Sequence, residues 1–200
     1  MSTNASSDDR IKYWDKTYGS ILPTNSAHAG IAIASLLPYA LYNYVIPDEH
    51  IFLSGELGSF EQRLGLLFSL QVLPAMVAVF YIGYTGLTRI PYSPAAAHDP
   101  AAMYASNKMP IEVHAANRAF TNTLEQYLLL WTSSCALVLQ LPANQLNLMP
   151  TLYLTWSICR VLYIVGYVTF GGSGRMIGFP GTVNSSFVAL CYAIYLMMTK

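Results

Sequence analysis

The sequence predicts an all-α integral membrane protein, and three observations lead to this prediction. Apolar residues make up 54% of the 200 residues and charged residues only 10%, whereas soluble domains usually carry about 25% charged residues. The mean hydropathy of the chain is +0.40. Apolar segments of about 20 residues, the length at which a helix crosses the hydrocarbon core of a bilayer, recur along the chain.

The composition also argues against several classes of protein. The formal net charge is zero, so nothing favours a nucleic-acid partner. The three cysteines, Cys135, Cys159 and Cys191, lie in apolar segments without a CxxC pair or a Cys/His cluster. The sequence therefore predicts no metal site and no closed disulfide framework.

The N-terminal part is expected to hold a polar tail and one transmembrane helix. Residues 1–26 are polar and lack a signal-peptide pattern, so we expect the first helix to act as the targeting signal. That helix is predicted at 27–47. Pro38 lies inside it and is expected to kink it, which membrane helices tolerate.

Four further spans are predicted at about 64–87, 111–141, 148–170 and 175–198, the last starting at residue 175 or 180. The proline-rich connection 89–110 is expected to be a loop. Residues 171–174 (Gly-Gly-Ser-Gly) are expected to end the fourth helix of the chain, because glycine accepts the positive φ that a helix end often needs. Arginine and lysine in the tail, the long loop and the glycine turn place these on the cytosolic side, so five spans put the N-terminus inside and the C-terminus outside.

The helix predicted at 111–141 opens with a polar stripe. Arg118, Asn122 and Glu125 stand at i, i+4 and i+7, so they share one face of a helix. Such residues are costly inside a bilayer and normally face a bundle interior or a wet cavity, where they mark a function.

The next helix carries a second polar stripe with Arg160, Tyr163 and Tyr167 at i, i+3 and i+7. Counted from the cytosolic end, Arg160 and Glu125 reach similar depths, so we expect them to form an intramembrane ion pair that is chiefly structural.

Nearer the cytosol, a ligand site is one interpretation of the remaining polar residues. The candidate residues are Arg118, Asn122, Tyr163, Tyr167 and Arg175. Two guanidinium groups suit an anionic ligand, because their planar forks pair with carboxylates. The alternative interpretation is an interfacial belt whose long side chains reach the water.

At these residues the sequence resembles the MAPEG family, the membrane-associated proteins of eicosanoid and glutathione metabolism. The family carries an Arg-x3-Asn-x2-Glu pattern at the start of one helix, an Arg-x2-Tyr-x2-Gly-Tyr pattern on the next, and a further arginine after that helix. The residues that match these patterns are Arg118, Asn122, Glu125, Arg160, Tyr163, Gly166, Tyr167 and Arg175.

The resemblance implies a four-helix transmembrane domain at 64–198 that forms a homotrimer, with the helix at 27–47 as an extra N-terminal span. It implies glutathione as co-substrate, bound between neighbouring subunits by Arg118, Asn122, Glu125, Tyr163, Tyr167 and Arg175. Arg175 would be the catalytic residue that stabilises the glutathione thiolate. The thiolate would then attack a lipophilic electrophile from the bilayer or reduce a hydroperoxide.

Three departures from the family pattern keep a second interpretation open. The span at 27–47 is additional to the family's four, and Gln126 stands where some transferases carry a tyrosine. The four-residue glycine turn also shifts Arg175 by one residue from the family's usual spacing. The alternative is a non-catalytic accessory or scaffold protein, and a small transporter or channel subunit is a third. The presence of both Arg118 and Arg175 favours the enzyme. The endoplasmic reticulum or another internal membrane is the expected location.

Overall fold

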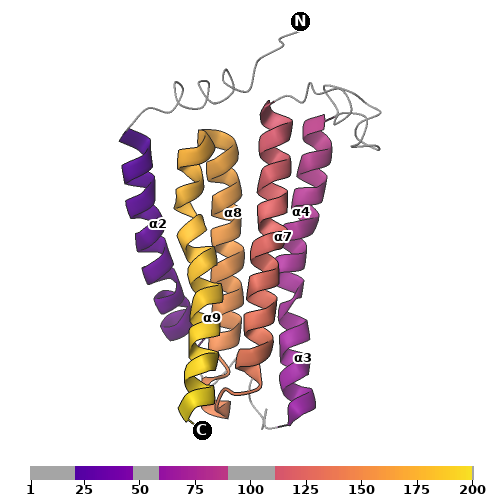
Figure 1. The fold of residues 1–200 in the computed structure, drawn as a ribbon, viewed down its shortest axis with the longest axis vertical. Helices are drawn as coiled ribbons and strands as arrows, with labels where there is room; N and C mark the ends of the chain where they lie inside the picture. The colour runs from indigo at the N-terminus through magenta and orange to yellow at the C-terminus, as the bar shows by residue number, and fades with distance from the viewer. Residues whose placement is uncertain (1–20, 47–58, 90–110, 200) are drawn as a thin grey trace, which may run out of the picture.

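The computed structural model describes residues 21–46, 59–89 and 111–199, and every regular element in these ranges is helical. The helices lie side by side along one long axis, and the start of α2 and the end of α9 lie at opposite ends of the bundle (Figure 1). The elements are α2 (Ile21–Ala40), η1 (Leu41–Val45), α3 (Phe60–Leu70), α4 (Val72–Arg89), α7 (Ile111–Val138), η2 (Ala143–Gln145), α8 (Leu148–Gly174), η3 (Arg175–Ile177) and α9 (Phe179–Thr199).

Three helical segments of the described chain are long and apolar enough to cross a membrane. They are Phe60–Thr88, Ala143–Tyr167 and Arg175–Thr199. The long helices α2 and α7 are not among them, and in α7 the polar stripe of Arg118, Asn122 and Glu125 lowers the hydropathy. These lengths and compositions agree with the predicted integral membrane protein.

α2 begins at Ile21, earlier than the expected start at residue 27, and it changes character after Pro38. Proline cannot donate the helical hydrogen bond to the residue four positions earlier. Three residues later the chain forms the π-helical turn η1, which closes with a 2.9 Å hydrogen bond from Ile46 N to Leu41 O. The predicted end of this span at residue 47 lies just outside the described residues.

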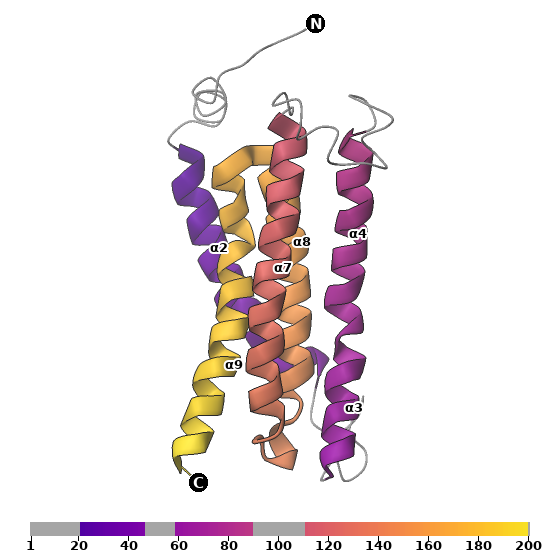
Figure 2. The same ribbon diagram turned by 45° about the vertical axis from the view of Figure 1, so that its right-hand side comes forward.

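The span predicted at 64–87 consists of two helices, α3 and α4, which continue one another along the same side of the bundle (Figure 2). α3 starts with a capping box in which Ser59 and Gln62 each bond the backbone N–H of the other. The break falls at Gln71, whose side chain donates to Tyr153 Oη at 2.6 Å and accepts from Tyr127 Oη at 3.0 Å. A polar side chain therefore joins α7 and α8 at the point where the apolar span is interrupted.

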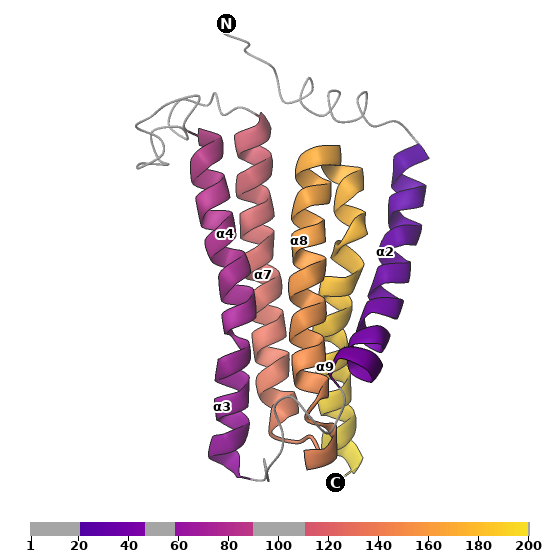
Figure 3. The same ribbon diagram turned by 180° about the vertical axis from the view of Figure 1, so that it is seen from behind.

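The prediction that the glycine run ends α8 at Phe170 is wrong. The helix continues through Gly174, which has right-handed helical angles of φ −64° and ψ −27° instead of a positive φ. The end of α8 nevertheless turns over toward α9 (Figure 3). A Cβ at Gly166 would overlap the carbonyl group of Gly174. Because glycine has no side chain, the end of α8 at Gly174 can lie directly against Gly166. The predicted loop at 89–110 lies outside the described residues, apart from Arg89, which ends α4.

The apolar core consists of side chains from α3, α7, α8 and α9. Its largest buried side chains include Leu130, Leu137, Tyr153 and Trp156. α7 ends at Val138, three residues before the predicted end, and Arg63 of α3 binds the carbonyl groups that this end exposes. Its Nη1 donates to Val138 O at 3.0 Å and to Leu141 O at 2.6 Å.

Candidate functional site

Arg160 of α8 lies at the centre of the candidate site and is fully buried, with an exposed fraction of 0%. Its guanidinium donates to the backbone oxygen of Asn122 at 2.8 Å and to the side-chain Oδ1 of Asn122 at 3.1 and 3.2 Å. The same group lies 4.5 Å from the ring centre of Tyr163 and 5.6 Å from that of Trp156. Neutral oxygens and aromatic faces thus compensate a cation that would be costly to bury alone.

These contacts fix the direction of the Asn122 amide. A guanidinium has donors only, so the amide must turn its oxygen toward Arg160 and its NH₂ group away. That NH₂ group donates to Oε2 of Glu125 at 3.5 Å, one turn further along α7. The sequence predicted a direct ion pair between Arg160 and Glu125. In the structure Asn122 stands between them, because Glu125 lies on the exposed side of α7 while Arg160 points into the bundle.

Tyr163 and Tyr167 form the aromatic part of the site on α8. Tyr163 is buried, and its ring stacks on Tyr167 with centres 5.8 Å apart and an interplanar angle of 14°. The ring of Phe179, at the start of α9, covers Tyr163 from a third direction at 6.3 Å. Tyr163 is therefore placed by packing between Arg160, Tyr167 and Phe179.

Two exposed arginines, Arg118 of α7 and Arg175 of η3, complete the set of predicted site residues. Both lie within electrostatic reach of Tyr163, as does Arg160, and Glu125 lies within reach of Arg160. The site therefore gathers three guanidinium groups and one carboxylate. A ligand with more negative than positive charges suits this balance.

The structure adds Tyr81 of α4, which the sequence analysis missed. Its ring is fully buried beside Phe120, and its buried hydroxyl lies next to the Thr123 side chain of α7. The Nε of Arg160 is buried without a hydrogen-bond partner. The buried positions Val77, Tyr81 and Thr85 recur every four residues, a helical spacing that was visible in the sequence and that predicts one inward face of α4.

Tyr127 takes no part in the candidate site. It points toward Gln71 and packs edge-on against Trp156 with ring centres 6.2 Å apart. The neighbouring Gln126 has a buried Oε1 without a hydrogen-bond partner. The position after Glu125 therefore carries an amide where a phenol would be expected from the tyrosine-bearing transferases.

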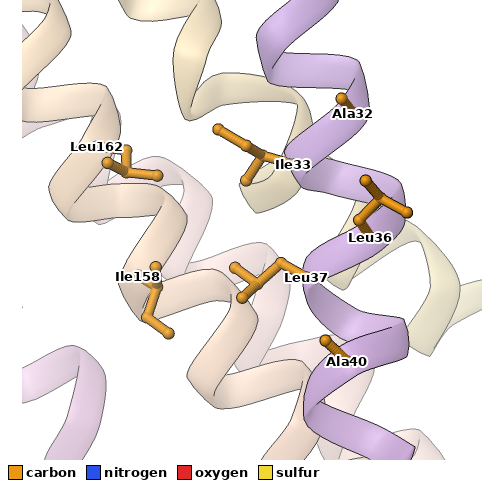
Figure 4. Close-up of a pocket in the computed structure, with 7 residues that line it drawn as sticks. All are labelled: Ala32, Ile33, Leu36, Leu37, Ala40, Ile158 and Leu162. Atoms are coloured by element: carbon orange, nitrogen blue, oxygen red, sulfur yellow. The ribbon is translucent and has the colours of Figure 1, made fainter.

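A separate open groove of about 410 Å³ lies between α2 and α8 (Figure 4). Its lining is entirely aliphatic or alanine and consists of Ala32, Ile33, Leu36, Leu37, Ala40, Ile158 and Leu162. An apolar groove offers nothing to a charged peptide, so it is not the candidate site. Among the residues that the structure describes, no group of three or more His, Cys, Asp or Glu side chains is placed to hold a metal ion.

Comparison with known proteins adds one finding to this geometry. The model of the MAPEG family matches residues 64–195, which include all the residues of the candidate site. No curated protein and no solved structure shows significant similarity to the chain.

Proposed function

Because the chain belongs to the MAPEG family, we propose that it is a membrane-bound glutathione transferase or peroxidase that acts on a lipophilic substrate. The observation that carries this proposal is the fixed Asn122 amide between buried Arg160 and exposed Glu125. It gives α7 an oriented donor and a carboxylate on the helix that also carries exposed Arg118, and exposed Arg175 lies within electrostatic reach of Tyr163. That combination matches a peptide with two carboxylates and one ammonium group.

Each part of glutathione has a counterpart in this arrangement. Arg118 pairs with a carboxylate, Glu125 with the ammonium group, and Asn122 with a peptide carbonyl. Tyr163 and Tyr167 form the aromatic wall, with Tyr163 buried behind Tyr167. Because Arg160 already holds Asn122, little side-chain freedom is lost when the peptide binds.

Arg175 is the residue that activates the thiol of glutathione. A thiol with a pKa of about 8.5 is mostly protonated at neutral pH, and a nearby cation lowers that pKa. In the transferase reaction the thiol proton leaves to water, the thiolate sulfur forms a bond to the electrophilic carbon, and the leaving group or opened ring takes up the electron pair. In the peroxidase reaction two glutathione molecules are oxidised to a disulfide, while a hydroperoxide is reduced to an alcohol and water.

The same proposal includes the architecture that the resemblance implies. Residues 64–198 form the four-helix domain, and α2 is an additional span at the N-terminus. Three copies of the chain assemble, with glutathione bound between neighbouring subunits. The bilayer of an internal membrane, such as the endoplasmic reticulum, delivers the lipophilic substrate.

A non-catalytic accessory protein is the second candidate, and the observation that favours it is the identity of Gln126. Its buried amide oxygen lacks a partner, and the phenol of the next residue, Tyr127, is engaged with Gln71. In such a protein the Arg160–Asn122–Glu125 arrangement would serve the fold alone.

Titration calorimetry with glutathione on detergent-solubilised protein separates the two candidates. We expect saturable binding in the millimolar range or tighter, weakened about tenfold or more by Glu125→Gln, because one charge-assisted contact contributes about 1.5–3 kcal/mol. Glu61→Gln removes an exposed carboxylate from α3 and serves as the matched control, with unchanged binding expected. Absence of binding by the wild-type protein would reject the enzyme in favour of the accessory protein.

A further inference from the structure

We infer that α2 positions Arg175 by clamping the η3 turn, and that Gly30 is the positioning residue that permits this contact. The inference rests on the proposed function, which assigns Arg175 to the thiolate. α2 lies outside the segment 64–195 that matches the family, yet it packs against η3 as well as against α8 and α9. An element added to the family domain therefore touches the turn that carries the proposed catalytic residue.

The contact between α2 and η3 is made by backbone against backbone. A Cβ at Gly30 would overlap the carbonyl oxygen of Met176, the residue that follows Arg175. It would also lie 3.0 Å from the Met176 carbonyl carbon and 3.2 Å from Cγ of Pro180. A backbone carbonyl cannot move aside by changing a rotamer, so any side chain at position 30 must push the two segments apart.

Two further glycines fix the same turn from the α8 side. A Cβ at Gly178 would overlap the Cys159 carbonyl oxygen and the Tyr163 nitrogen, and a Cβ at Gly166 would overlap the carbonyl group of Gly174. Close backbone contacts at Gly30, Gly166 and Gly178 thus hold η3 in place. The Arg175 side chain itself is exposed. Of these three contacts, only the one at Gly30 comes from outside the family segment.

The packing of α2 differs between the faces of the helix. One turn after Gly30, the Ala34 carbonyl accepts a 3.4 Å hydrogen bond from Asn184 Nδ2, and Ala34 itself is buried. The face of α2 that includes Leu36 and Ala40 instead leaves the open apolar groove to α8 (Figure 4). On the face of α2 that carries Gly30 and Ala34, the helix therefore packs closely against η3 and α9.

The test compares Gly30→Ala and Gly30→Leu with Gly83→Ala in the full-length, detergent-solubilised protein. A Cβ at Gly83 of α4 would have nothing within 4 Å, so both alanine variants gain the same helix propensity and only Gly30→Ala meets a neighbour. The first readout is the initial rate of tryptic cleavage between Arg175 and Met176, followed by mass spectrometry. Proteolysis follows the population in which a segment is locally open, so we expect cleavage about tenfold faster in Gly30→Ala, faster again in Gly30→Leu, and unchanged in Gly83→Ala.

The second readout is steady-state kinetics with glutathione. Gly30→Ala should lower kcat while leaving the KM for glutathione nearly unchanged, because the residues that hold the peptide belong mainly to α7 and α8. Equal cleavage rates in all proteins would overturn the clamp, and a proportional loss of kcat and affinity with a lower unfolding temperature would overturn the positioning role. If the wild-type protein shows no glutathione-dependent activity, the proposed function fails, and the cleavage rates alone still decide whether α2 holds the turn.

Discussion

At the scale of single residues, the polar stripe of α7 contacts Arg160 of α8 through Asn122. The spacing of Arg118, Asn122 and Glu125 predicted that they share a helix face, and the structure leaves Arg118 and Glu125 exposed with Asn122 half-buried between them. The partner of Arg160 was not predictable in the same way. Spacing gives the face of a helix but not its rotation against a neighbour, and that rotation brings Asn122 instead of Glu125 to the guanidinium.

The Arg160–Asn122 contact predicts a specific loss of stability. Asn122→Ala removes both hydrogen bonds to Oδ1 and leaves the backbone oxygen and the two aromatic faces to compensate a buried cation. We expect the free energy of unfolding to fall by about 1.5–3 kcal/mol, the range typical of hydrogen bonds to charged groups. Circular dichroism during thermal unfolding in detergent measures this change without glutathione.

Thr121→Ala is the neighbouring control for this prediction. The Thr121 hydroxyl is exposed and bonds only the Asn117 carbonyl of its own helix, so its removal should change stability by less than about 0.5 kcal/mol. Equal stability of Asn122→Ala and Thr121→Ala would show that Asn122 does not compensate the charge of Arg160.

At the scale of helices, the apolar segments were predicted well and their ends less well. The segment predicted at 148–170 corresponds to α8 and the one predicted from 175 or 180 corresponds to η3 and α9. The error at the end of α8 has a physical cause. Glycine permits two things, a positive φ and a close approach, and the sequence does not say which of them a given glycine provides. Gly166 provides the close approach, because its missing side chain leaves room for the Gly174 carbonyl group.

The break at Gln71 shows a second limit at this scale. A continuous apolar run predicts one span, and nothing local signals that the Gln71 amide will bond to both Tyr127 and Tyr153. Those partners come from positions more than 50 residues away in the chain. Long-range polar contacts of this kind depend on how the helices are arranged, which one sequence does not determine.

Arg63 of α3 is predicted to stabilise the end of α7. Arg63→Leu removes the group that binds the carbonyls of Val138 and Leu141. We expect a loss of about 1–3 kcal/mol in the free energy of unfolding, because buried carbonyls would lose their partner. Thermal unfolding of Arg63→Leu beside Glu61→Gln, an exposed neighbour in α3, measures it, and identical curves would contradict the capping role.

At the scale of the whole molecule, the long axis of the bundle separates two chemical regions. The apolar core of Leu130, Trp156 and their neighbours fills the half toward the C-terminal end of α9. The charged residues of the candidate site gather in the other half, where α7 begins and α8 ends. This arrangement suits a reaction between a water-soluble peptide and a substrate dissolved in the bilayer.

The proposed five spans predict that the two termini lie on opposite sides of the membrane. The start of α2 and the end of α9 lie at opposite ends of the bundle, as an odd number of crossings requires (Figure 1). Epitope tags at each end, exposed to protease in sealed microsomes, measure this. We expect an N-terminal tag to be digested and a C-terminal tag to be protected, whereas digestion of both would contradict the five-span topology.

The ultraviolet absorbance of the glutathione thiolate bound to the purified protein tests whether Arg175 activates the thiol. With Arg175 present, we expect a thiolate signal that titrates well below the pKa of about 8.5 of a free thiol. Arg175→Ala should abolish that signal near neutral pH while glutathione still binds. Bound glutathione that titrates like the free thiol in the wild-type protein would contradict thiolate activation.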